Sequence, residues 1–373
     1  FKKAEALVTA LQTKEVALQG GAKVYLTYAD GGKYAFTNGA DESKLTLGAD
    51  NVLTINGDMD SVNVKVGSVK AAAIKVESGK TVDSIIVNDG SANELKLTGE
   101  GTVTKLDAKG DITVTASADT TLTNIEVAEN KTLTTNSDIK AGSITGNGNV
   151  TANGALTVTK DISAASVTTT GALTATKVTA GTVKAESVTA DVKADSLELT
   201  GSGEVTVGGS AKNWDVGTLK TNGDLTVSDA SKLKANSIES TGDLKISDEA
   251  NTLSATNITS GGALTIANAG NVAEGANIKT EGGLTVTAGD LKAGSLSVDG
   301  ELTAGTNTIS ADSIEFGKSA TIADNNTNIK ANAVTIDTTS MTKENIAKLK
   351  IEPKTEGGTV NVKVVTNNGR GQG

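Results

Sequence analysis

The sequence contains no cysteine and no histidine, a single proline and a single arginine. Without cysteine the chain can form neither a disulfide framework nor a thiolate metal site. Without histidine it also lacks the commonest general base, and its one arginine, Arg370, lies in the last few residues. We therefore expect no catalytic residue, no cofactor and no bound metal, and we expect that the protein is not an enzyme.

Charge and hydropathy argue against two further classes of function. The formal net charge is −10, and lysine supplies all the basic residues except Arg370. Nucleic-acid binding usually requires clustered basic side chains, with aromatic residues for single strands, so we expect no nucleic-acid partner. No stretch approaches the roughly 20 apolar residues of a membrane-spanning helix, so we expect no membrane span.

Aromatic residues make up only 2% of the chain, and five of the seven precede residue 40. The rest of the chain must therefore build its core from valine, isoleucine, leucine and alanine. A wide globular core is difficult to fill with these residues alone, whereas a narrow and regularly stacked core suits them.

Two interleaved motifs repeat with one period. The first reads Gly-x-Leu-(Thr/Lys)-(Val/Ile), and its leucines follow one another after 19, 20, 20 and 18 residues: Leu225, Leu244, Leu264, Leu284 and Leu302. The second reads (Lys/Ser)-Ala-x-(Ser/Asn)-(Ile/Val/Leu), and its last positions keep a spacing of 18 to 20 residues: Ile238, Ile258, Ile278, Leu296, Ile314 and Val334.

Apolar residues alternate within each repeat, which is typical of a strand with one buried face. A βαβ unit needs about 30 residues, so a period of 18 to 20 is too short for it. The sequence therefore predicts an all-β fold, a single-stranded parallel β-solenoid with 18 to 20 residues per coil and about 15 coils over residues 45–336. Equivalent leucines should form one buried column. A row of small sandwiches is the rival interpretation, but it would need core aromatics.

The two ends differ from the middle, which predicts three segments: 1–44, 45–340 and 341–373. Residues 1–18 have the apolar spacing of an amphipathic helix, and residues 22–37 read as a β-hairpin. Residues 342–350 can form a short helix and 358–366 a strand, before a glycine-rich tail. We expect both ends to act as caps, since an open solenoid exposes strand edges.

The same ends supply the candidate assembly contacts, because they hold an aromatic cluster, an alternating valine strand and the only arginine. Tyrosine is enriched at interfaces. The candidates are Phe1, Tyr25, Tyr28, Tyr34, Phe36, Val360, Val362, Val364 and Arg370.

The best metal candidate is the turn over residues 56–61, which contains Asp58 and Asp60. Calcium takes six to eight oxygen ligands, and this segment supplies only two carboxylates. We therefore interpret it as a solvated turn.

The threonine-, valine-, glycine- and asparagine-rich ladder, for example over Val62–Val87 and Gly101–Val114, resembles β-solenoid regions of bacterial cell-surface proteins. These include S-layer-associated proteins, filamentous adhesins and autotransporter passengers. The resemblance is one of architecture and composition, and it covers about residues 45–336. It implies secretion and a place outside the cell or on its surface. A chain that starts at Phe1 instead of Met agrees with removal of a secretion signal, or with a trimmed sequence.

These observations favour an extracellular structural protein, a subunit that assembles with copies of itself into a bacterial surface layer or filament. The alternative is a monomeric surface adhesin or stalk that binds a cell-wall or host glycan or a matrix ligand. A polysaccharide-acting β-helix enzyme is a more remote alternative, because the short coils leave little room for catalytic loops.

Overall fold

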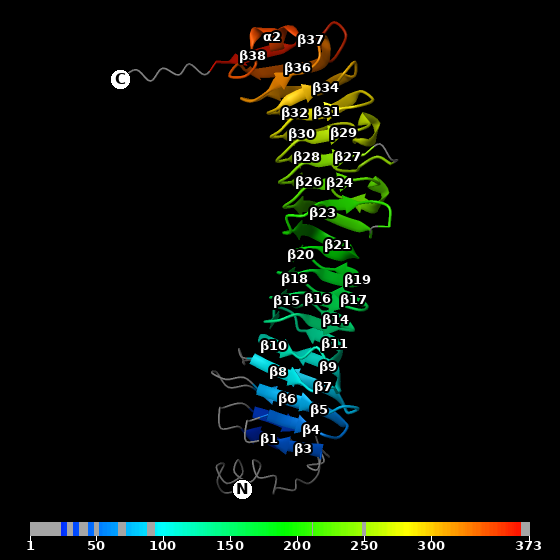
Figure 1. Ribbon diagram of the computed structural model, residues 1–373, viewed down its shortest axis with the longest axis vertical. Helices are drawn as coiled ribbons and strands as arrows, with labels where there is room; N and C mark the ends of the chain where they lie inside the picture. Colours follow the sequence, from blue (N-terminus) through cyan, green and yellow to red (C-terminus); the bar gives the residue numbers. More distant parts are fainter. Residues whose placement is uncertain are drawn as a thin grey trace, which may run out of the picture. The chain divides into compact units, whose positions relative to one another are not determined.

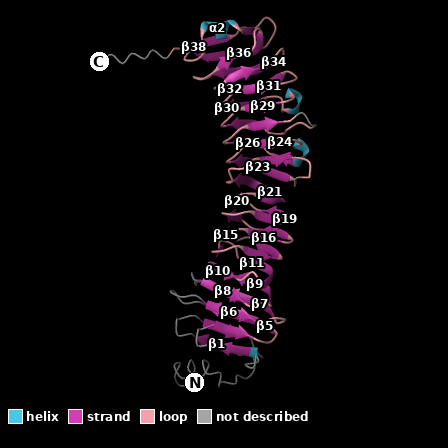
Figure 2. Cartoon of the chain, viewed as in Figure 1, coloured by secondary structure: helices cyan, strands magenta, loops and turns pink. Residues whose placement is uncertain are grey.

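Short strands dominate the computed structural model, in which they make up 59% of the described residues and helix only 4%. The structure describes residues 24–27, 33–36, 44–47, 52–65, 72–87, 94–210, 212–247 and 251–366. The predicted helix over residues 1–18 lies outside these ranges. The strands form a parallel β-solenoid of about 15 turns, so the predicted fold class is confirmed. The chain divides into two compact units, residues 1–191 and 192–373, in which strands cover strands row upon row (Figures 1 and 2).

The first unit begins with antiparallel strands and continues with parallel ones. Its strands are β1 (Val24–Thr27), β2 (Lys33–Phe36), β3 (Leu45–Leu47), β4 (Val52–Ile55), β5 (Met59–Lys65), β6 (Ala72–Val76), β7 (Thr81–Val87), β8 (Glu94–Thr98), β9 (Thr102–Ala108), β10 (Ile112–Ala116), β11 (Thr121–Val127), β12 (Thr132–Thr135), β13 (Ile139–Ala141), β14 (Ser143–Gly146), β15 (Asn149–Ala152), β16 (Leu156–Val158), β17 (Asp161–Ser163), β18 (Ser166–Thr169), β19 (Leu173–Thr179) and β20 (Thr182–Ala185). Strand β21 (Val188–Leu199) runs into the second unit.

The walls of the first unit follow from these pairings. Strands β4, β6, β8, β10, β12, β15, β18 and β20 form one parallel wall. Strands β5, β7, β9, β11, β14, β17 and β19 form a second wall, and β13, β16 and β19 form a short third. The predicted hairpin is present, because β1 pairs antiparallel with β2, which in turn pairs antiparallel with β5.

The second unit repeats one long and one short strand in each coil. Its elements are β22 (Val205–Val207), β23 (Trp214–Thr221), β24 (Leu225–Val227), η2 (Ala230–Lys232), β25 (Leu233–Lys234), β26 (Ser237–Ser240), β27 (Leu244–Ile246), β28 (Asn257–Ser260), β29 (Leu264–Ile266), η3 (Ala269–Asn271), β30 (Ala276–Thr280), β31 (Leu284–Val286), β32 (Leu291–Val298), β33 (Glu301–Thr303), β34 (Thr308–Phe316), β35 (Thr321–Ile322), β36 (Thr327–Asp337), α2 (Lys343–Ala347), β37 (Leu349–Pro353) and β38 (Asn361–Val365).

The predicted leucine column exists in the second unit, and a second column of aliphatic residues accompanies it. In the short-strand sheet Leu225, Leu244, Leu264 and Leu284 are successive register partners, and each is at most 1% exposed. In the long-strand sheet the column runs through the second motif, with the partners Ile238, Ile258, Ile278, Leu296, Ile314 and Val334. Each row is thus buried by the rows on either side of it.

The glycine of the first motif is explained by close backbone contact between successive turns. A Cβ atom added at Gly282 would lie 2.6 Å from the carbonyl carbon of Gly262, and one added at Gly262 would lie 2.2 Å from Asp243 Oδ1. That same oxygen accepts a hydrogen bond from the backbone N–H of Ala263 at 2.8 Å. Only glycine, which has no Cβ atom, allows the backbones of successive turns to approach this closely.

A buried hydroxyl precedes this glycine in several coils. Thr221, Ser240, Ser260 and Thr280 are register partners, and their exposure is at most 1%. Ser240 Oγ donates to the carbonyl of Gly242 at 2.9 Å, and Thr280 Oγ1 donates to that of Gly262 at 2.8 Å. The hydroxyls are therefore satisfied by the turn carbonyls, as buried polar groups must be.

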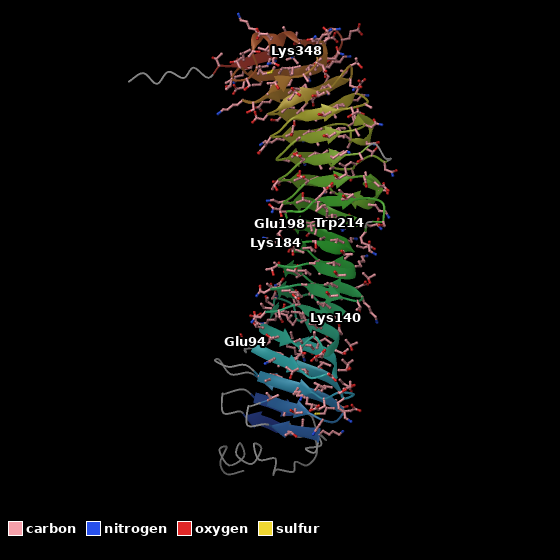
Figure 3. The ribbon with its side chains drawn as sticks, viewed as in Figure 1. Glu94, Lys140, Lys184, Glu198, Trp214 and Lys348 are labelled. Atoms are coloured by element: carbon pink, nitrogen blue, oxygen red, sulfur yellow. The ribbon has the colours of Figure 1, made fainter. Side chains whose placement is uncertain are left out.

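Charged side chains lie on the outside of the coils, as Lys140 and Lys184 do (Figure 3). The two aromatic residues of the predicted solenoid segment lie in its core instead, since Trp214 is 7% exposed and Phe316 is fully buried. No helix of the described ranges has the length and apolar character needed to cross a membrane.

Candidate functional site

The last coil of the second unit is the part of the structure that most resembles a contact surface. Strand β36 pairs in parallel with β37 along its first half and with β38 along its second half. Among the described residues no further strand pairs with β38. Backbone groups of a parallel strand point alternately to its two neighbours, so one row of N–H and C=O groups on β38 has no ladder partner.

The side chains of β38 show the same incompleteness. Val362 follows Val334 in the long aliphatic column, and Val364 follows Ile336. Val334 is fully buried and Ile336 is 2% exposed, whereas Val362 is 50% and Val364 52% exposed. Together with Val365, at 38%, they are the exposed large hydrophobic residues of the described chain. The two columns therefore end in apolar side chains that the described residues leave exposed to solvent.

The short-strand sheet ends differently, because helix α2 covers its last strand, β35. The backbone N–H of Ile322 donates to Asn345 Oδ1 at 3.0 Å, and Lys348 Nζ donates to the Ile322 carbonyl at 3.1 Å. Thr342 starts the helix, and its hydroxyl accepts a hydrogen bond from the Asn345 N–H at 3.4 Å. Side chains of the helix thus occupy the positions that another strand would fill.

Strand β37 pairs with β36 alone among the described residues, and it contains the only proline of the sequence. Pro353 is the register partner of Ala331. Proline is tolerated at sheet edges because it has no N–H to donate, and it discourages further pairing there. Strand β38 has no such residue, so it is the more accessible of the two edges.

The predicted assembly contacts are only partly placed by the structure. Phe1, Tyr28 and Arg370 lie outside the described residues. Tyr25 lies on β1, and Tyr34 and Phe36 lie on β2, so the aromatic positions belong to two paired strands. Val360 directly precedes β38, while Val362 and Val364 lie on it. Whether any of these residues contacts another copy stays a prediction.

Two features of this end were missed from the sequence. Val365 adds to the exposed apolar surface, although it breaks the alternation of the valines before it. Asn345 and Lys348 cover β35, and no sequence signal indicated that role, because it depends on where the helix comes to lie. The predicted helix and strand of this segment are present as α2 and β38.

A groove crosses the outer face of strands β28, β30, β32, β34 and β36. It has a volume of about 340 Å³, and polar and apolar surface line it in similar measure, contributed by Asn257, Thr259, Asn277, Ile278, Lys279, Ser295, Leu296, Ser297, Ser313, Ile314, Glu315, Ala333 and Thr335. Asn277 Oδ1 accepts from Ser295 Oγ at 2.9 Å. No aromatic side chain lines the groove, so a sugar ring would find hydrogen-bonding groups there but no stacking partner.

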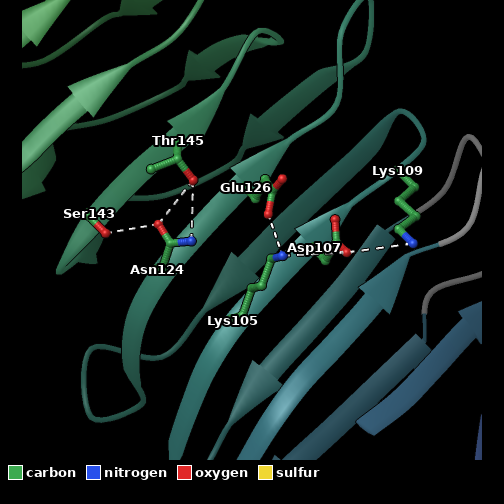
Figure 4. A network of polar contacts seen from close by, with 7 residues as sticks. All are labelled: Lys105, Asp107, Lys109, Asn124, Glu126, Ser143 and Thr145. Carbon is green, nitrogen blue, oxygen red and sulfur yellow. Dashed lines mark hydrogen bonds and ion pairs between the residues drawn. The ribbon is translucent and has the colours of Figure 1, made fainter.

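Charged residues of the first unit neutralise one another between strands β9 and β11 and along β9 (Figure 4). Lys105 forms an ion pair with Glu126 and lies 4.0 Å from Asp107, which also faces Lys109 at 3.8 Å. The hydrogen bond to Glu126 raises the pKa of Lys105 above its usual value of 10.5, against a smaller lowering by burial. A proton-accepting lysine would need a lowered pKa, so this network does not resemble a general base.

The Asp58 turn serves a contact between coils. Asp58 Oδ1 accepts a hydrogen bond from the Thr81 N–H at 2.9 Å, and Lys44 Nζ donates to the Asp58 carbonyl at 2.9 Å. Within the described ranges no group of three or more acidic residues is placed to hold a metal ion.

Comparisons with protein-family models, with curated proteins and with solved structures found no match to this chain.

Proposed function

We propose that this chain is an extracellular structural protein, a subunit that assembles with copies of itself into a bacterial surface layer or filament and has no catalytic role. The observation that carries the proposal is the last coil, where among the described residues β38 pairs along one edge only and Val362, Val364 and Val365 are exposed. Such an edge is a ready template for pairing with another chain.

Secretion and a place on the cell surface belong to the same proposal. They are supported by the acidic, cysteine-free composition and by the resemblance of the coils to surface solenoids. The polar contacts of the outer faces also support a structural role, since neighbouring coils satisfy one another's side chains instead of converging on a reactive centre.

Electron microscopy of the purified full chain tests this function. Concentrated protein should form filaments or sheets with a regular repeat, across a range of salt and with or without added Ca²⁺. Dispersed single molecules under all these conditions would contradict the proposal.

The groove on β28 to β36 favours a second candidate, a surface adhesin that binds a neutral glycan. Beside apolar positions, its lining offers amide and hydroxyl groups on successive strands, which repeat roughly every 4.8 Å. A glycan array probed with the full chain should then show binding that Asn277→Ala reduces. Equal binding by the variant would remove the groove from consideration.

A further inference from the structure

Strand β38 sets clear demands on whatever covers it. The covering segment must be extended, must have a free backbone edge, and must present aliphatic residues two positions apart to meet Val362 and Val364. These demands follow from the rows below, where Leu296 and Val298, Ile314 and Phe316, and Val334 and Ile336 stack in the same two columns.

One strand of this chain, β1, fits these demands in its backbone pairing and in the spacing of its sequence. Strand β1 is the outer strand of the hairpin, because β2 pairs with β1 on one side and with β5 on the other. Within the described ranges β1 pairs with β2 alone. Its sequence Val24-Tyr25-Leu26-Thr27 places two aliphatic residues two positions apart.

We propose that the open edge of β38 receives strand β1 of a second copy, so that copies of this chain join head to tail. The inference rests on the proposed assembly function and specifies its contact. Because the two edges are different strands, each copy would offer one of each, and such a heterologous contact produces an open chain of subunits unless its geometry closes a ring.

Charge does not oppose this pairing. Residues 341–366, around β38, contain five lysines and three glutamates, a surplus of two positive charges. Residues 1–58, up to the turn before β5, contain six lysines and seven acidic residues, which nearly balance. The two segments therefore do not repel each other, although the whole chain carries a net charge of −10.

Charge disfavours the simplest rival, in which β38 pairs with β38 of another copy. An antiparallel two-fold contact that matches Val362 with Val364 would set Lys363 directly opposite its own equivalent. Like charges opposite each other across a strand pair are destabilising. The pairing of β38 with β1 has no such conflict.

The test compares the full chain with two single variants by sedimentation velocity over a range of concentrations. Val362→Lys puts a charge on the open edge. The control Thr285→Lys puts one on the outer face of β31, in the column of register partners that already contains Lys245. Both variants should have the circular dichroism spectrum and the melting temperature of the parent. We expect parent and control to assemble alike, and Val362→Lys to associate at least tenfold more weakly.

Mixing distinguishes a head-to-tail contact from a contact between two β38 strands. Val362→Lys keeps an intact β1, so it should add to the end of a growing chain and then block it, and assemblies of the parent should become shorter as the variant is added. Unchanged assembly by Val362→Lys, or parent assemblies whose length the variant does not alter, would overturn the head-to-tail contact while leaving assembly itself in place. A parent that stays monomeric at every concentration would overturn the proposed function together with this inference.

Discussion

Val334 and Val362 are neighbours in one column of the solenoid, yet the first is fully buried and the second is 50% exposed. The residue type, the strand direction and the inward orientation are the same. The difference is that a row covers Val334 on each side, whereas Val362 has a row on one side only. Burial in this fold therefore comes from the next coil and not from the local sequence.

The two sheets of the second unit extend the comparison to backbone groups. The last short strand, β35, is covered by α2 through Asn345 and Lys348. The last long strand, β38, pairs with β36 alone among the described residues. One end face thus contains both a completed edge and an open one, and the open edge carries the exposed valines.

The largest effect should come from truncating Val334, the buried one of the two neighbouring valines Val334 and Val362. Val334→Ala removes two methyl groups from a filled column and should lower the free energy of unfolding by about 2–3 kcal/mol, from lost apolar burial and the cavity left behind. Val362→Ala is its matched control and should cost less than about 1 kcal/mol. Chemical denaturation followed by circular dichroism measures both, and equal losses would contradict the comparison.

The next effect concerns the glycine column. Gly282→Ala places a methyl group against the backbone of Gly262 and should cost about 1–3 kcal/mol, because the stacked turns must separate. At Gly203 an added Cβ would meet nothing within 4 Å, so Gly203→Ala should change stability by less than about 0.5 kcal/mol. Thermal melting of the two variants decides the matter. A neutral Gly282→Ala would show that the turns are not in close contact.

The covered edge can be opened with one substitution. Asn345→Ala leaves the Ile322 N–H without its acceptor and should cost about 1–2 kcal/mol. Amide exchange at Ile322 should quicken in the same variant. Asn332→Ala, at an exposed position of β36, is the control and should leave both quantities unchanged. Slow exchange at Ile322 in the Asn345 variant would show that the helix side chain is not what protects this edge.

The smallest effect concerns the surface ion pairs. The hydrogen bond with Glu126 raises the pKa of Lys105, so its contribution to stability is complete below pH 10.5 and is lost as pH rises through the higher pKa of the folded protein. Such exposed pairs contribute little. Titration of the Lys105 side chain by nuclear magnetic resonance should give a pKa above 10.5, and Glu126→Gln should lower it. An identical titration in both proteins would contradict the assignment.

The strands and columns of the repeating middle of the chain could be predicted closely, because in its motifs each position of the coil takes a particular residue type. The glycine and the leucine each have one place in the coil, so the column of Leu225 followed from spacing alone. The buried hydroxyls of Thr221, Ser240, Ser260 and Thr280 were not predicted. Coil length was less predictable where the motifs fade. Ile74 pairs with Leu97, 23 residues on, and Leu133 pairs with Val150, 17 residues on. Turns absorb such changes without disturbing the columns.

The candidate site was predictable only in its sequence pattern. Alternation indicated that Val362 and Val364 share one face of a strand, but exposure depends on whether another row follows, and that is a property of the folded chain. Similarly, Thr342 could be read as a helix start, but the contact of Asn345 with β35 depends on the direction in which the helix leaves β36.

Residue-resolved hydrogen exchange of β36 and β38 in dilute solution tests the central claim most directly. The amides of β36 should exchange slowly throughout, whereas those of β38 that point away from β36 should exchange quickly and become protected as the protein concentration rises. If the amides of β38 are as protected as those of β36 at the lowest concentration, the edge is already covered and the account of an open last row is wrong.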